Sequence, residues 1–176
     1  RQKPSWLKFR LAVWKINKMA SVLNNLSVYN PKNVPDGRKY RFALVVSEWN
    51  ANITESLFEG AFQALIKHNV LKENIVRIDV PGSFELVYGA SKAQQMDVDA
   101  VISIGSVIQG ETRHFEFICN AVAHGIKDLN LSGKIPVIFC VLTDDTMAQS
   151  EARSGGTLGN KGVEAAVAAL KMVAIP

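Results

Sequence analysis

The sequence predicts an α/β fold in three layers, with a four-stranded parallel sheet covered by helices on both faces. Four short runs rich in β-branched residues have the continuous apolar character of strands buried on both faces, and they span residues 42–47, 75–80, 100–105 and 137–142. Segments with helical periodicity lie between and after these runs. This alternation is typical of parallel strands joined by right-handed crossovers.

The helices are predicted from capping residues and from apolar residues at helical spacing. Asn52 and Glu55 form a capping-box pattern, and the residues behind them that should face the sheet are Ile53, Leu57, Ala61 and Leu65. Further helices are expected from Ser83 to about Met96, over residues 113–130, from a Thr146 and Gln149 capping box to Arg153, and after a glycine-rich joint at residues 155–159.

Charge is divided unevenly along the chain. Residues 1–18 carry six Lys or Arg residues and no acid, so the formal net charge of +4 leaves −2 for residues 19–176. The body therefore gives no charge argument for nucleic acid, and no apolar run approaches the ~20 residues that span a membrane. We expect a dispensable basic extension at 1–18 and a single domain at 19–176. A membrane- or RNA-binding arm is the open alternative for residues 1–18.

Several common site types find no support in the motifs. Cys119 and Cys140 have no CxxC spacing, so neither a zinc site nor a disulfide framework is expected, and a reducing cytoplasm fits best. The dinucleotide pattern GxGxxG and the hydrolase pattern GxSxG are absent. Gly110 is followed by Glu111 where a phosphate-binding P-loop would require lysine.

A binding site is expected at the carboxyl ends of the strands, where ligands of open parallel sheets bind. The segments that follow the four strands should converge there, and they are residues 48–52, 81–85, 106–114 and 143–146. In the third segment a strand runs into a polar turn and then a helix start. Free N–H groups of Gly110, Glu111 and Thr112 would suit a phosphate oxygen. His114 in the first helical turn favours the neutral imidazole that can accept a proton, which predicts chemistry on a phosphorylated small molecule.

Four motifs in register carry a more specific resemblance. VPGSFEL, IGSVIQGETRHFEFI, PVIFCVLTDDTMAQSEARSG and GNKGVEAA, in this order, resemble the 6,7-dimethyl-8-ribityllumazine synthase family across residues 28–175. The resemblance implies a flavodoxin-like, doubly wound topology. It also implies a transferase that makes 6,7-dimethyl-8-ribityllumazine from 5-amino-6-(D-ribitylamino)uracil and 3,4-dihydroxy-2-butanone 4-phosphate, the penultimate step of riboflavin synthesis. Phosphate and water are lost, and no metal or other cofactor is implied.

The same resemblance assigns roles to positions in this chain. His114 would be the acid/base group, and residues 110–112 would bind phosphate. Phe139 and Arg153 would reach the site of an adjacent subunit, with Lys161 and Glu164 in support. The implied substrate-binding residues are Trp49, Ser83, Phe84, Glu85, Ser106, Val107, Ile108, Gly110, Glu111, Thr112, Phe139 and Arg153.

The residues alone leave other interpretations open. Trp49 could cover the sheet edge, Glu85 and Arg153 could complement helix dipoles, and His114 could be an ordinary surface histidine. The chain also departs from the family pattern. Gln109 stands where arginine is common, and Cys140 and Ser150 replace a usual glycine and alanine.

The resemblance further implies an assembly, either a pentamer or a 60-subunit shell of pentamers. The short glycine-rich joint favours the shell. The alternative function is a catalytically silent shell protein that binds a flavin or lumazine, and Gln109 keeps this alternative open.

Overall fold

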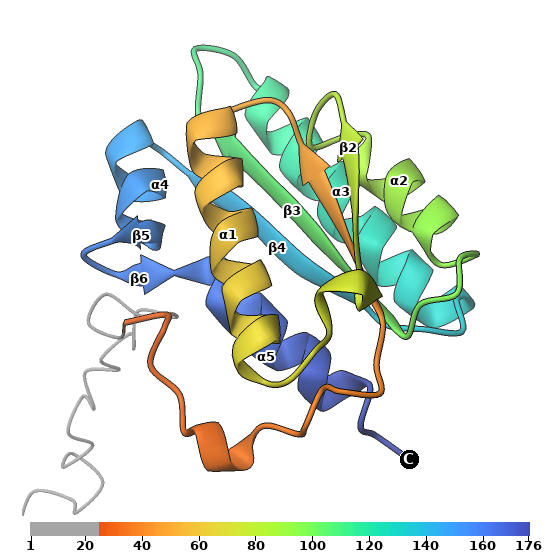
Figure 1. Cartoon of the computed structure of the whole chain (residues 1–176). Coiled ribbons are helices and arrows are strands. Elements are labelled where there is room, and N and C mark those ends of the chain that lie inside the picture. The colour runs from red at the N-terminus through yellow and green to blue at the C-terminus, as the bar shows by residue number, and fades with distance from the viewer. Residues whose placement is uncertain (1–24) are drawn as a thin grey trace, which may run out of the picture.

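The computed structural model describes residues 25–176, so the expectation for residues 1–18 lies outside the described residues. Its centre is the predicted parallel sheet, with strand order β2-β1-β3-β4 (Figure 1). The strands are β1 (Phe42–Ser47), β2 (Ile75–Val80), β3 (Ala100–Ile108) and β4 (Val137–Asp144). The bounds predicted for β1 and β2 are confirmed. Strands β3 and β4 run longer than predicted because they stay paired as far as Ile108 and Asp144.

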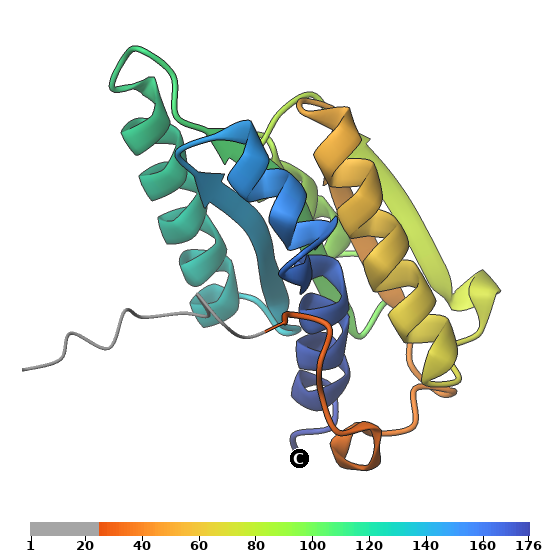
Figure 2. The ribbon, with the colours of Figure 1, turned by 90° about the vertical axis from the view of Figure 1, so that its left-hand side faces the viewer.

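Two pairs of helices cover the two faces of the sheet, which gives the three predicted layers (Figures 1 and 2). Helices α1 (Ala51–Lys67) and α5 (Lys161–Met172) pack on the β1 side chains at 42, 44 and 46. Helices α2 (Leu86–Ala93) and α3 (His114–Ser132) pack on the side chains at 43 and 45. Successive residues of a strand point to opposite faces, so a continuous apolar run supplies both cores.

Two predicted helix starts are wrong. Helix α1 begins at Ala51 after Asn50, which has a left-handed backbone with φ 61°, and Asn52 lies inside the helix. Its proposed capping partner Glu55 instead binds Arg77, whose NH1 donates to Oε2 of Glu55 over 2.9 Å. Helix α2 begins at Leu86 and not at Ser83, because residues 81–85 form a turn at the sheet edge.

After β4 the chain builds a small unit beside the sheet. Helix α4 (Met147–Arg153) has the predicted cap, since Thr146 Oγ1 accepts from the N–H of Gln149 over 3.3 Å. The glycine-rich joint is not a plain loop: it forms an antiparallel hairpin of β5 (Ser154–Gly156) and β6 (Gly159–Asn160). Two short 3-10 turns, η2 (Pro31–Asn33) and η3 (Lys72–Asn74), complete the described part. No helix within residues 25–176 has the length and apolarity to cross a membrane.

Candidate functional site

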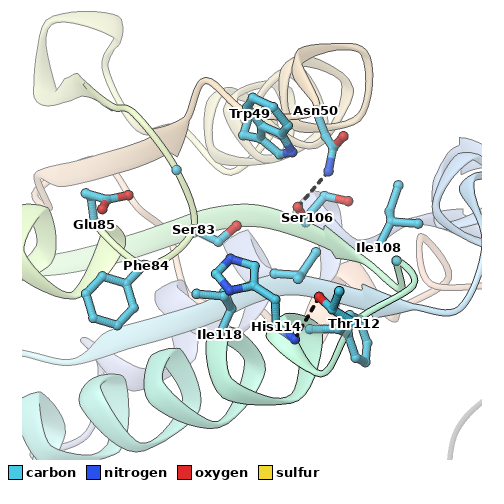
Figure 3. Close-up of a pocket in the computed structure, with 14 residues that line it drawn as sticks. Trp49, Asn50, Ser83, Phe84, Glu85, Ser106, Ile108, Thr112, His114 and Ile118 are labelled. Atoms are coloured by element: carbon cyan, nitrogen blue, oxygen red, sulfur yellow. Dashed lines mark hydrogen bonds between the residues drawn. The ribbon is translucent and has the colours of Figure 1, made fainter.

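A cleft of about 750 Å³ opens at the carboxyl ends of β1, β2 and β3 (Figure 3). It lies where the strand order reverses between β1 and β3, the position predicted for a ligand crevice. The residues that line this strand-end cleft are Trp49, Asn50, Gly82, Ser83, Phe84, Glu85, Ser106, Val107, Ile108, Gly110, Thr112, His114, Phe115 and Ile118.

Three of the four predicted strand-end segments meet at the cleft. The segment after β4, residues 143–146, does not line it, because β4 is the edge strand beyond β3 and α4 leads the chain away. Glu111, Phe139 and Arg153 do not line the cleft of their own chain either. The site roles assigned to these three residues stay predictions.

Some cleft residues were missed as site residues. Asn50 and Gly82 fall inside the segments expected to converge, so their position next to a strand end was the available signal. Phe115 and Ile118 lie on α3 one turn apart, and both line the cleft together with His114. Helical spacing, from His114 to Ile118 and from Ile118 back to Phe115, was the signal that could have predicted them.

The corner at residues 49–50 ties two strand ends together. Asn50 Nδ2 donates to the backbone oxygen of Ser106 over 2.9 Å, and the Trp49 N–H donates to the Pro81 oxygen over 3.2 Å. These bonds leave the Trp49 side chain 72% exposed on the rim. In Figure 3, Trp49 and Asn50 lie on one side of the cleft, and Phe84 and His114 on the other. A flat aromatic ligand between them would find apolar surface on both sides.

The turn at residues 81–85 brings a free hydroxyl and a carboxylate to the cleft. Ser83 is buried, and its Oγ forms no hydrogen bond with any described residue. A Cβ on Gly105 would lie 2.8 Å from Ser83 Oγ and 2.8 Å from a methyl group of Leu86, so this close approach requires glycine. Phe84 and Glu85 are exposed. Because Ser83 also lines the cleft, its hydroxyl is available to a ligand there.

The loop between β3 and α3 leaves backbone donors free. The Gln109 N–H donates to the Asp144 oxygen over 3.0 Å, and the Gln109 side chain folds back onto the Gly110 oxygen over 2.7 Å. Within residues 25–176, the N–H groups of Gly110, Glu111 and Thr112 take part in no hydrogen bond. His114 is the first residue of α3, so the positive end of the helix faces the same place. This arrangement suits an anion with an imidazole beside it.

Among the described residues that line the cleft there is no Lys or Arg, and Glu85 is the one Asp or Glu. In this part of the chain, the cleft's own lining therefore offers an anion free backbone N–H groups but no cationic side chain. Arg153, the last residue of α4, has its NH1 2.9 Å from the Gln149 oxygen and 3.7 Å from Oδ1 of Asp144. Phe139 lies on the edge strand β4 and is 37% exposed.

Neither cysteine has the features of a nucleophile. Cys140 is buried in β4, and burial raises the pKa of its thiol to about 12. Burial also raises the pKa of Cys119 on α3. A thiol with a raised pKa holds its proton at neutral pH and packs as a small apolar side chain. Among the described residues, no three His, Cys, Asp or Glu side chains gather as a metal site requires.

Comparisons with known proteins agree on one family. The family model described as 6,7-dimethyl-8-ribityllumazine synthase matches residues 39–176. The protein of that name from Christiangramia forsetii is 60% identical over 88% of this chain and 93% of its own length. The one from Flavobacterium johnsoniae is 59% identical over 89% and 83%. The one from Porphyromonas gingivalis is 51% identical over 89% and 98%.

Proposed function

The chain belongs to the 6,7-dimethyl-8-ribityllumazine synthase family, and we propose that it condenses 5-amino-6-(D-ribitylamino)uracil with 3,4-dihydroxy-2-butanone 4-phosphate. The products are 6,7-dimethyl-8-ribityllumazine, phosphate and water. The single observation that carries the proposal is the cleft itself. Three strand ends meet there and bring together an exposed aromatic ring, a free hydroxyl beside a carboxylate, and a histidine beside the loop at residues 110–112, here called the anion loop.

The pyrimidine ring binds between Trp49 and the end of β3. The Trp49 indole stacks on the ring, because flat π surfaces pack over a broad apolar area. The backbone of residues 106–108 reads the ring's polar edge, and the Ser106 oxygen is held in place by Asn50. Neutral amide groups in fixed positions select the pattern of donors and acceptors on the ring.

The ribityl chain binds along residues 83–85. Its hydroxyls supply the partner that Ser83 Oγ lacks within the described chain, and the Glu85 carboxylate accepts from others. Phe84 is 55% exposed and covers the carbon chain.

The butanone phosphate binds at residues 110–112 with its phosphate on the free backbone N–H groups. Since no Lys or Arg of the same described chain lines the cleft, Arg153 of an adjacent subunit supplies the cation and Phe139 of that subunit supplies an apolar wall. A planar guanidinium pairs two phosphate oxygens at once. Lys161 and Glu164, which pair with each other at the start of α5, support this neighbouring unit.

His114 transfers protons during the condensation. It accepts a proton as the pyrimidine's amine attacks the ketone, and it returns one as water leaves to form the imine. The same imidazole accepts a proton from the hydroxyl-bearing carbon as phosphate is eliminated, and it returns that proton to the terminal carbon as the resulting enol becomes a ketone. The ribitylamino nitrogen attacks this ketone, and ring closure expels a second water. Phosphate on the helix terminus leaves as a stabilised anion. No cofactor has a role in these steps.

A site shared between subunits requires an oligomer, and we propose a pentamer, with twelve pentamers closing into a 60-subunit shell. We place the protein in the cytoplasm, where the free thiols Cys119 and Cys140 stay reduced. The body needs no nucleic acid or membrane partner. The second candidate function is a silent lumazine- or flavin-binding shell, which one observation favours: Gln109 brings no charge to the loop and bonds to the loop itself.

The test is to mix purified protein with both substrates and follow lumazine fluorescence against the uncatalysed background. His114→Ala is expected to lower kcat about 100-fold, in the range of a lost acid/base group. Arg153→Ala is expected to raise the KM for the butanone phosphate while leaving the KM for the pyrimidine near its original value. Wild-type protein that assembles and binds lumazine but forms none would establish the silent shell.

The shared site has its own test. His114→Ala and Arg153→Ala chains, each impaired alone when the butanone phosphate is kept well below the KM of the Arg153→Ala chain, are co-expressed in equal amounts so that they assemble together. About a quarter of the sites then pair an intact cleft with an intact neighbouring arginine, and activity returns to that fraction of wild type. Mixed assemblies that stay as impaired as the parents would show that both residues act within one subunit.

A further inference from the structure

Asp144 is a buried carboxylate to which the proposed reaction gives no role. It ends β4, and its side chain is 10% exposed. Ser150 on α4, which is fully buried, donates its hydroxyl to Oδ2 of Asp144 over 2.8 Å. The other carboxylate oxygen, Oδ1, lies 3.7 Å from NH1 of Arg153. The carboxylate thus stands between a buried hydroxyl and the guanidinium that serves the adjacent cleft.

The cluster of Asp144, Ser150 and Arg153 also reaches the chain's own cleft. The Asp144 backbone oxygen accepts from Gln109 at the start of the anion loop over 3.0 Å. The Ser150 hydroxyl lies 3.5 Å from the Ser106 hydroxyl, and Ser106 lines the cleft. The Asp144 backbone is thus bonded to the end of β3, and its carboxylate contacts Ser150 and Arg153, both on α4.

We infer that Asp144 is a positioning residue that holds Arg153 in the orientation needed to bind substrate phosphate in the adjacent cleft. The inference rests on the proposed function. A buried carboxylate needs charged or hydrogen-bonding partners, and Arg153 is its cationic partner within the described residues. The Gln149 oxygen takes a second contact from the same NH1 atom. Two acceptors restrict the long Arg153 side chain, which would otherwise lose rotamer freedom each time it binds phosphate.

Ser150 orients the Asp144 carboxylate. Its hydroxyl fixes one carboxylate oxygen, so that the other oxygen faces Arg153. A residue without a hydroxyl at position 150 would leave Asp144 with one fewer donor and a freer side chain. The hydroxyl at 150 and the carboxylate at 144 therefore act as one unit.

The experiment compares Asp144→Asn with Asp145→Asn in the full-length protein. Asp145 is the exposed neighbour and forms no ion pair among the described residues, so it matches the charge change without the contact. Asp144→Asn is expected to raise the KM for 3,4-dihydroxy-2-butanone 4-phosphate about tenfold, as expected from a weakened charge-assisted contact. The KM for the pyrimidine stays unchanged, which separates positioning of Arg153 from a general loss of structure. Asp145→Asn leaves both constants at wild-type values.

A double-mutant cycle with Arg153→Gln supplies the second readout. If Asp144 acts through Arg153, Asp144→Asn adds no further rise in KM to the Arg153→Gln chain. Ser150→Ala, the smaller change, raises the same KM about threefold, and it decides the question if Asp144→Asn does not fold.

Three results would overturn the inference. They are an unchanged or lowered KM for the butanone phosphate in Asp144→Asn, an equal rise in both KM values, and an additive effect on the Arg153→Gln background. Wild-type protein that makes no lumazine would remove the proposed function and this inference with it. If the wild type is active and Asp144→Asn has the same KM for the butanone phosphate as Asp145→Asn, this inference alone is wrong.

Discussion

Asn50 offers a direct test of how the cleft is held together. Its backbone is in the left-handed region, with φ 61° and ψ 46°, and its side chain donates to the oxygen of Ser106, which is 1% exposed. Asparagine tolerates this conformation better than most residues. Asn50→Gly removes the hydrogen bond and keeps the backbone free of strain. Asn50→Ala removes the same bond and adds strain, so the pair separates the two contributions.

The magnitudes follow from the two contacts. The lost hydrogen bond costs about 1 kcal/mol. Glycine adds ~0.7 kcal/mol through the entropy of the unfolded chain, which gives about 1.7 kcal/mol for Asn50→Gly. Alanine in a left-handed conformation adds ~1.5 kcal/mol to the lost bond, which gives about 2.5 kcal/mol for Asn50→Ala. Alanine should therefore be the less stable variant by close to 1 kcal/mol.

Urea unfolding at one fixed subunit concentration measures both variants, because association changes apparent stability. The KM for the pyrimidine should rise by a similar factor in both variants, since both release the Ser106 oxygen that reads the ring. An alanine variant as stable as the glycine variant would refute the left-handed backbone at Asn50. A pyrimidine KM that changes in neither would refute the role of the Asn50 and Ser106 bond in the cleft.

Three further predictions concern the rest of the chain. Gly162→Ala should lower the unfolding free energy by at least ~2 kcal/mol, because the new Cβ would lie 1.9 Å from the Leu57 oxygen and force α1 and α5 apart. Gly110→Ala is the control: its Cβ would meet nothing within 4 Å, so the unfolding free energy should stay within ~0.5 kcal/mol of wild type. Burial lowers the pKa of His68, so the unfolded chain binds a proton at this residue more readily than the folded chain. The contribution of His68 to the unfolding free energy should therefore be fully present above about pH 6.5 and be lost as the pH falls below that value. Urea titrations at several pH values should show a shallower pH dependence for His68→Gln. Deletion of residues 1–18 should leave lumazine formation unchanged, and a loss of activity would show that the basic extension contributes to the site or the assembly.

The sheet was predictable because its signal is local and repeated. All six residues of β1 are buried, and a continuous run of apolar, β-branched residues predicts such a strand without knowledge of its neighbours. Helix starts were less predictable because polar side chains choose partners far along the chain. Asn50 and Glu55 bind Ser106 and Arg77, so the local capping pattern at Asn52 gave the wrong start.

The same distinction applies to the site. The rule that loops at strand ends converge predicted three segments that do line the cleft, at residues 48–52, 81–85 and 106–114, and a fourth, at residues 143–146, that does not. The cluster of Asp144, Ser150 and Arg153 could not be predicted in this way. It depends on the register that pairs Ile108 with Asp144, and on α4 turning Ser150 toward the end of β4. A register of this kind is set by the whole sheet, so single residue types do not reveal it.

The stoichiometry of the wild-type reaction is the decisive test of the proposed condensation. Lumazine formed and phosphate released are followed together after the two substrates are mixed, and the uncatalysed background is subtracted from each. An enzyme that condenses these substrates forms both products at equal rates, well above background, with multiple turnovers per subunit. Phosphate and lumazine at background rates, from protein that has assembled and binds lumazine, would contradict the proposed condensation.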